Sequence, residues 1–151
     1  MSLLFRVRTR LCALPLAHVL ETMRPLPIEP MAGASPSLRG LAIIRGAPVP
    51  VVDVACLLGD DSTPADVEAL TPASARFVMT RIADRGIALA VDAVVGVRFI
   101  DGDSFREMPP LLRDADVDVV DAIGTLDAEL LLVLRSARLV PSSLRGGESA
   151  S

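Results

Sequence analysis

Closely spaced acidic side chains are the first candidates for chemistry in this chain, because neighbouring carboxylates can bind cations. The acidic run consists of Asp114, Asp116, Asp118 and Asp121. An EF-hand loop beginning at Asp114 would need glycine at its sixth position and glutamate at its twelfth, but Val119 and Thr125 stand there. Valines alternate with the acids, so the pattern favours the solvent-facing side of a strand and no metal site.

The residue types that carry out nucleophilic catalysis do not form a recognisable arrangement. The single histidine, His18, lies in an aliphatic segment, and no serine lies in a G-x-S-x-G turn. The glycine spacing fits neither a phosphate-binding loop nor a dinucleotide-binding turn. Cys12 and Cys56 have apolar, strand-like surroundings in the sequence, and we expect two buried free thiols. We therefore expect no catalytic residue, no metal site and no cofactor.

Arg45 is the charged residue with the most informative position. It directly precedes Gly46, which can supply the positive φ of a tight turn between two apolar strands. An arginine there either covers and pairs with its neighbours or hydrogen-bonds a partner protein, and the sequence leaves both interpretations open. Glu21 is a candidate ion-pair partner for Arg45.

Composition excludes several classes of function. The chain has 151 residues, of which 51% are hydrophobic, and its net charge is −4. A negative charge and the absence of tryptophan and tyrosine argue against nucleic-acid binding. Asp53 and Asp92 interrupt the longest apolar runs, and the N-terminal arginines alternate with apolar residues as in a strand. We therefore expect a cytoplasmic protein without membrane insertion.

Twelve prolines and ten glycines punctuate short apolar runs with a period of two, which predicts an all-β fold. The predicted strands are Leu3–Leu14, Val19–Met23, Gly40–Arg45, Val49–Val54, Arg76–Ile82, Ile87–Val97, Val117–Leu126 and Leu130–Leu134. Short helical turns are predicted at Ala55–Leu58 and Ser136–Val140.

The chain has two halves that echo one another. Residues 51–58 and 133–140 share one layout, an apolar strand end, a charged residue and a short turn ending in two aliphatic residues. We expect one domain over residues 1–140, with a first barrel over 14–60, a connector over 59–75 and a second barrel over 76–140. The N-terminal strand is expected to be shared between the lobes, and residues 141–151 to form a disordered tail.

Five segments, in the correct order, resemble the CheW family of chemotaxis coupling proteins. They are Leu14–Met23, Gly40–Asp53 with its arginine–glycine turn, Gly86–Val97 with its Val-Asp pair, Phe105–Pro109 and Leu130–Leu134. The resemblance covers residues 3 to 140. It implies an all-β fold of two SH3-like five-stranded β-barrels packed together, with short helical turns, and it implies no catalysis.

The same resemblance implies an adaptor that couples the cytoplasmic hairpin of a chemoreceptor to the regulatory domain of a CheA-type histidine kinase. Other CheW-like domains are further implied partners. The residues it places at the receptor-facing region are Val19, Glu21, Gly40, Arg45 and Gly46. Those it places toward the kinase are Phe105, Arg106 and Pro109.

Two other interpretations stay open. Ser37 and Leu38 stand where the family usually has an aromatic residue before the glycine matched by Gly40. This departure favours a one-sided binder, or decoy, that tunes the composition of a receptor array. A small-ligand-binding protein or enzyme using the groove between the barrels is the third interpretation, and it would require convergent polar groups in an enclosed pocket.

Overall fold

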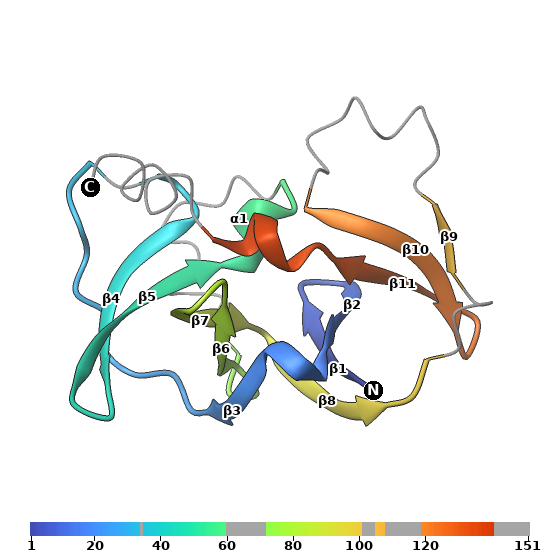
Figure 1. Ribbon diagram of the computed structural model, residues 1–151, viewed down its shortest axis with the longest axis horizontal. Coiled ribbons are helices and arrows are strands. Elements are labelled where there is room, and N and C mark those ends of the chain that lie inside the picture. Colours follow the sequence, from blue (N-terminus) through green and yellow to red (C-terminus); the bar gives the residue numbers. More distant parts are fainter. Residues whose placement is uncertain (34, 60–71, 101–104, 108–118, 141–151) are drawn as a thin grey trace.

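The computed structural model describes residues 1–33, 35–59, 72–100, 105–107 and 119–140, and of residues 105–107 only the backbone. In this described part the chain forms eleven strands in two sheets. Figure 1 shows the sheets side by side, with the helix α1 (Val54–Leu57) and the 3-10 helix η3 (Ser136–Leu139, in red) between them. A second 3-10 helix, η1, covers Leu16–His18.

The first sheet has five strands in the order β3-β6-β7-β5-β4. Their bounds are Val19–Met23 for β3, Leu38–Ile44 for β4, Ala47–Asp53 for β5, Arg76–Ile82 for β6 and Arg85–Val91 for β7. The second sheet has the order β8-β1-β2-β11-β10-β9. Its strands are β1 (Ser2–Val7), β2 (Arg10–Pro15), β8 (Ala93–Arg98), β9 (Phe105–Glu107), β10 (Val120–Leu126) and β11 (Glu129–Leu134).

The two sheets repeat one pairing pattern, apart from the three-residue strand β9. In each sheet an antiparallel hairpin joins a second hairpin through a parallel pair, β5 with β7 in the first sheet and β11 with β2 in the second. The segments that echo each other in the sequence, 51–58 and 133–140, contain the ends of β5 and β11 and the helical turns after them. They therefore occupy equivalent places in the two sheets.

Apolar side chains fill three cores, because alternate residues of the central strands face opposite sides of their sheet. The shared core lies between the sheets and includes Phe5, Leu14 and Leu134 from the second sheet and Val52, Val78 and Leu89 from the first. The buried residues of the first inner core all come from the first sheet and are Ala42, Ile44, Val49, Val51, Phe77 and Ala88. The second inner core consists of Leu4, Leu11, Ala13 and Leu131.

The predicted strands Val19–Met23 and Arg76–Ile82 are confirmed, and most other bounds differ by a few residues. Two predicted strands are wrong because each contains a break. Leu3–Leu14 is a hairpin that turns at Arg8, whose φ is 58°. Ile87–Val97 is interrupted at Asp92, where the chain leaves the first sheet and enters the second. Residues 117–118 and 141–151 lie outside the described part.

The sheets divide the chain differently from the expected lobes of residues 14–60 and 76–140. Strands β6 and β7 follow the connector but pair with β3 and β5, so they complete the first sheet. The N-terminal hairpin β1–β2 pairs with β8 and β11 and completes the second. A period-two pattern indicates that a segment is a strand but does not indicate which strand it pairs with. Long-range pairing determined which sheet each strand joined.

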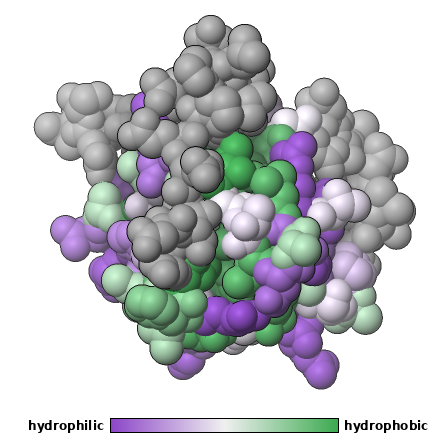
Figure 2. All heavy atoms as spheres, turned by 90° about the vertical axis from the view of Figure 1, so that its right-hand side faces the viewer, coloured by the Kyte–Doolittle hydropathy of each residue, from purple (hydrophilic) through white to green (hydrophobic). Residues whose placement is uncertain are grey.

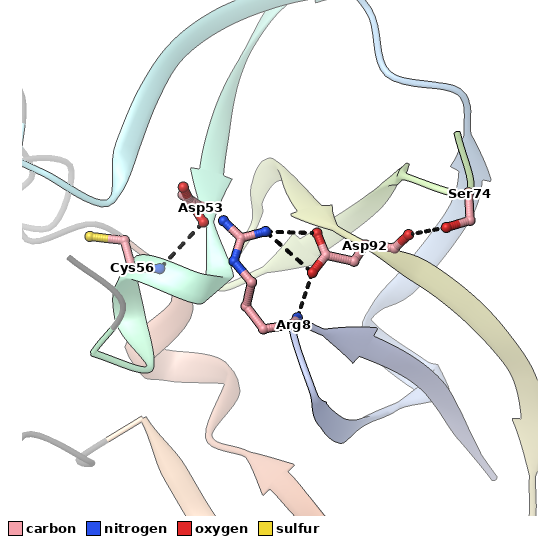
Figure 3. A network of polar contacts seen from close by, with 5 residues as sticks. All are labelled: Arg8, Asp53, Cys56, Ser74 and Asp92. Atoms are coloured by element: carbon pink, nitrogen blue, oxygen red, sulfur yellow. Dashed lines mark hydrogen bonds and ion pairs between the residues drawn. The ribbon is translucent and has the colours of Figure 1, made fainter. Parts of the chain in front are cut away.

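Asp92 ties the crossing point between the sheets to the N-terminal hairpin (Figure 3). Its carboxylate accepts from the backbone N–H of Arg8 and pairs with the Arg8 guanidinium, with Nη1 3.2 Å from Oδ1. The backbone N–H of Asp92 donates to the carbonyl of Arg6 at 2.9 Å, and the hydroxyl of Ser74 donates to the carbonyl of Asp92 at 2.7 Å. The Arg8 and Asp92 side chains are only 28% and 25% exposed.

We expect Asp92→Ala to lower the free energy of unfolding by about 1–3 kcal/mol, because it removes the carboxylate that accepts from the backbone N–H of Arg8 and pairs with its half-buried guanidinium. The matched control is Arg98→Ala. Arg98 pairs with Asp127 at the same 3.2 Å, but the two side chains are 48% and 76% exposed. Its removal should therefore cost less than about 1 kcal/mol. Urea unfolding measures both variants, and equal losses would contradict the assignment of Asp92 as a structural tie.

Candidate functional site

Arg45 lies at the tip of the β4–β5 hairpin and forms a two-pronged ion pair with Glu21. Arg45 and Gly46 have φ values of 51° and 80°, as the two central residues of a tight hairpin turn require. Nε of Arg45 donates to Oε2 of Glu21 at 2.8 Å, and Nη2 donates to Oε1 at 2.8 Å. The ion-pair partner suggested by the sequence is therefore confirmed.

This ion pair joins the two edges of the first sheet. Glu21 belongs to β3 and Arg45 follows β4, and these are the outermost strands of the order β3-β6-β7-β5-β4. Among the described residues, no ladder of backbone hydrogen bonds connects β3 to β4. The side-chain pair thus spans the opening of the first barrel, where no strand ladder joins the described strands β3 and β4.

The pair also changes the protonation behaviour of its members. The hydrogen bond from Arg45 lowers the pKa of Glu21; desolvation opposes this effect, and the positive charge of Arg45 reinforces it. The same hydrogen bond raises the pKa of Arg45, with help from the negative charge of Glu21. Both groups therefore stay charged at neutral pH, and the Arg45 side chain is 75% exposed.

The expected receptor-facing residues do not all reach the surface. Gly46 shares the exposed turn with Arg45. Val19 lies on β3 with Glu21 but packs partly against the shared core. Gly40 lies earlier on β4 and is buried. The structure thus brings Glu21, Arg45 and Gly46 together at one end of the first sheet, with Val19 beside them on β3.

Of the expected kinase-facing residues, Phe105 and Arg106 lie in the edge strand β9. Their backbones pair with Gly124 and Ile123 of β10. Pro109 lies outside the described residues. Strand β9 therefore places these positions at the free edge of the second sheet, away from the β4–β5 hairpin (Figure 1).

Exposed apolar residues beside these charges did not stand out in the sequence. Leu20 precedes Glu21 on β3, and Ile43 lies two residues before Arg45 on β4; their side chains are 53% and 64% exposed. On the second sheet, Val95 and Val97 of β8 and the following Phe99 are exposed too. Figure 2 faces the end of the molecule with β9–β11 and shows apolar surface with charged residues beside it. Alternation in the sequence indicates which residues of a strand face away from the core. It does not indicate whether another segment covers them, so these exposed residues could not be found from the sequence.

The remaining sequence candidates show no reactive arrangement in the described part of the chain. Asp121 pairs with Arg135, with 3.5 Å between Oδ1 and Nε, and the other acids of its run lie outside that part. Within it, no group of three or more histidine, cysteine or acidic residues could hold a metal ion. Cys12 is buried as expected, but Cys56 is only partly buried, which corrects that expectation.

Comparison with known proteins identifies the family. The family model for the CheW-like domain matches residues 2–143. This chain belongs to the CheW-like domain family. A solved structure, the scaffolding protein TtCheW from Thermoanaerobacter tengcongensis, superimposes with a TM-score of 0.74 and 23% identity, covering 89% of this chain and 87% of that one. Among curated protein sequences none matches.

The comparisons confirm the expected fold, the CheW fold of two SH3-like barrels, whose sheets here stay open at their edges. Family membership supports a chemotaxis coupling adaptor in general terms and is consistent with a protein that is not an enzyme. Among the described residues, no helix is long and apolar enough to cross a membrane.

We expect Arg45→Met to raise the pKa of Glu21 back toward the ordinary glutamate value, because it removes the hydrogen bond and the charge that lower it. Carboxyl carbon NMR titration of both proteins measures this. A lowered folded-state pKa stabilises the protein above the unfolded-state pKa, and that contribution disappears as the pH falls through the lowered value. Because the pair is exposed and screened by solvent, the acid limb of the wild-type stability curve should show only a small loss of this kind, and that of Arg45→Met should show none.

The thiol of Cys12 should resist modification in the folded protein, because burial raises its pKa to about 12. Ellman's reagent at pH 8 should react with the partly buried Cys56 first and with Cys12 only after unfolding. Cys56→Ser isolates Cys12 for this measurement, and fast labelling of Cys12 in that variant would show that the shared core opens readily.

Proposed function

We propose that this protein couples the cytoplasmic hairpin of a chemoreceptor to the regulatory domain of a CheA-type histidine kinase within a cytoplasmic receptor array. The receptor binds at the end of the first sheet that carries Val19, Glu21, Arg45 and Gly46. The kinase domain binds at strand β9 of the second sheet, which contains Phe105 and Arg106, and at Pro109. Membership in the CheW-like family supports the role, and one feature of the structure supports the receptor face.

That feature is the exposed guanidinium of Arg45 held by Glu21. A guanidinium has five N–H donors, and Glu21 accepts only two hydrogen bonds from it. The others can bind carboxylate or carbonyl oxygens on a receptor helix. Leu20 and Ile43 lie on the adjacent strands and can pack against an apolar stripe of the same helix. A charged anchor with apolar neighbours is typical of an energetically important interface residue.

The receptor and kinase faces lie on different sheets, so one molecule can hold both partners at once. Each contact is small, and small interfaces bind weakly on their own. Repetition of such contacts in an array increases the overall strength through the effective concentration of linked sites. The protein needs no chemical reaction for this role, since its work is to hold two partners in a fixed relation.

A one-sided binder, or decoy, is the second candidate. Ser37 is buried and Leu38 begins β4, so the residues that depart from the family pattern lie beneath the surface of the first sheet. A change there acts on the receptor face through packing, which is how a binder of the kinase alone could have arisen.

Arg45→Ala should weaken binding of a receptor hairpin by about tenfold, the effect of one lost interface anchor. Its melting temperature should stay near that of the wild type because the pair is exposed. Isothermal titration with the hairpin, and separately with the kinase regulatory domain, measures this. Kinase binding should not change.

Arg98→Ala is the matched control, because Arg98 is another exposed arginine in an ion pair and lies on the second sheet. It should bind the hairpin as the wild type does. If the wild-type protein binds the kinase domain but not the receptor hairpin, the decoy function is established. If it binds neither partner, both the coupling function and the decoy function are refuted. A large loss of melting temperature in Arg45→Ala would show that this residue is structural.

A further inference from the structure

Gly40 belongs to the expected receptor face, yet another segment of the chain covers it. Residues 24–31, here called the strap, leave the end of β3 and cross to β4. Glu29 and Leu41 exchange two backbone hydrogen bonds of 2.8 and 2.9 Å, an isolated bridge on the outer edge of β4. Gly40, next to Leu41, is buried beneath this bridge and has no side chain. A receptor would therefore meet the strap before it met Gly40.

Only glycine fits at position 40. A Cβ atom there would overlap the carbonyl oxygen of Glu29 and would lie 2.8 Å from Cγ2 of Ile28. The obstacle is mainly backbone, which cannot turn aside as a flexible side chain can. Any other residue at position 40 must therefore push residues 28–29 away from β4.

The strap closes the same opening that the Arg45–Glu21 pair spans. It begins after Met23 on β3 and reaches Leu41 on β4, which are the two edges of the first sheet. Leu26 and Ile28 of the strap pack against the first inner core. Pro25, Pro27 and Pro30 have no backbone N–H to donate. The strap is therefore held against the sheet by the Glu29 bridge and by the side chains of Leu26 and Ile28.

We propose that Gly40 is a positioning residue for the receptor face: it seats the strap on β4, and the seated strap holds β3 and β4 at the separation that aligns Glu21 with Arg45. Only the part of this inference that concerns receptor binding rests on the proposed function. It assigns to Glu29 and Ile28 a part in receptor binding that their sequence does not suggest, and it removes Gly40 from the surface that a receptor touches.

Gly40→Ala tests the inference, with Gly96→Ala as the control. The φ of Gly96 is 149°, close to the 145° of Gly40, but a Cβ atom on Gly96 would meet nothing within 4 Å. The control therefore places an alanine at nearly the same φ without the collision. In Gly40→Ala, the amide protons of Glu29 and Leu41 should lose protection from hydrogen exchange, and the pKa of Glu21 should return toward its ordinary value. In Gly96→Ala neither should change.

Binding of a receptor hairpin to Gly40→Ala should weaken by about tenfold, as after loss of the Arg45 anchor itself. Ile28→Ala is the second variant, because it loosens the strap while the sequence of β4 stays unchanged, and it serves if Gly40→Ala fails to fold. It should reproduce the altered Glu21 titration and the weaker binding. Arg45→Ala combined with Ile28→Ala should then bind no worse than Arg45→Ala alone, since both act through one ion pair.

Two results would overturn the inference. One is a Gly40→Ala protein that binds the hairpin poorly while Glu21 titrates as in the wild type, since Gly40 would then contact the receptor itself. The other is an Ile28→Ala protein with unprotected Glu29 and Leu41 amides but an undisturbed Glu21. Exchange and titration need no partner, so they decide the positioning role even if the wild type binds no receptor hairpin and the proposed function fails.

Discussion

The apolar contact between the two sheets is the constraint on which the rest of the structure depends. Side chains from both sheets, with Val54 and Leu139 of the helical segments between them, fill one shared core. The chain crosses between the sheets after β2 and again at Asp92, so the first sheet is one continuous stretch of sequence, inserted between the two parts that form the second sheet. Burial removes apolar surface from water only while both sheets are in place. The two proposed partner faces are therefore held at a fixed relation by the core itself.

The two lobes share one architecture, but the acidic and the basic member of an ion pair exchange places between them. In the first sheet the acidic residue lies on the edge strand β3 and the arginine lies in the β4–β5 turn. In the second sheet Arg98 ends the edge strand β8, and Asp127 lies in the β10–β11 turn. The φ values of Arg45 and Asp127, 51° and 50°, show that the two turns share their geometry. The charged residue at the hairpin tip is therefore positive on the first barrel and negative on the second, so the two tips differ in the charge that they present.

Local features of the fold could be predicted from the sequence, and long-range ones could not. Alternation gave Val19–Met23 and Arg76–Ile82 because one strand face or both are buried. The turn at Arg8 was missed because an arginine with positive φ is uncommon, and nothing nearby signals it. Sheet membership of β6 and β7 depends on pairing with β3 and β5, which period-two patterns do not encode. Arg45 could be identified as a site candidate because its position before Gly46 is a local feature. The burial of Gly40 depends on the strap, which comes from another part of the chain, so the sequence did not indicate it.

The energetics of the Arg45–Glu21 pair favour a role in binding over one in stability. An exposed ion pair contributes little to folding, since water solvates both groups well and screens their attraction. Two parallel hydrogen bonds nevertheless restrict the guanidinium to one orientation. A side chain that is already ordered loses less conformational entropy when a partner binds, and the saving appears as affinity. The half-buried Arg8–Asp92 pair has the opposite character, because it is shielded from solvent and fastens a crossing between the sheets. The exposure of the side chain, more than the length of the ion pair, thus distinguishes Arg45, which is available to a partner, from Arg8, which stabilises the fold.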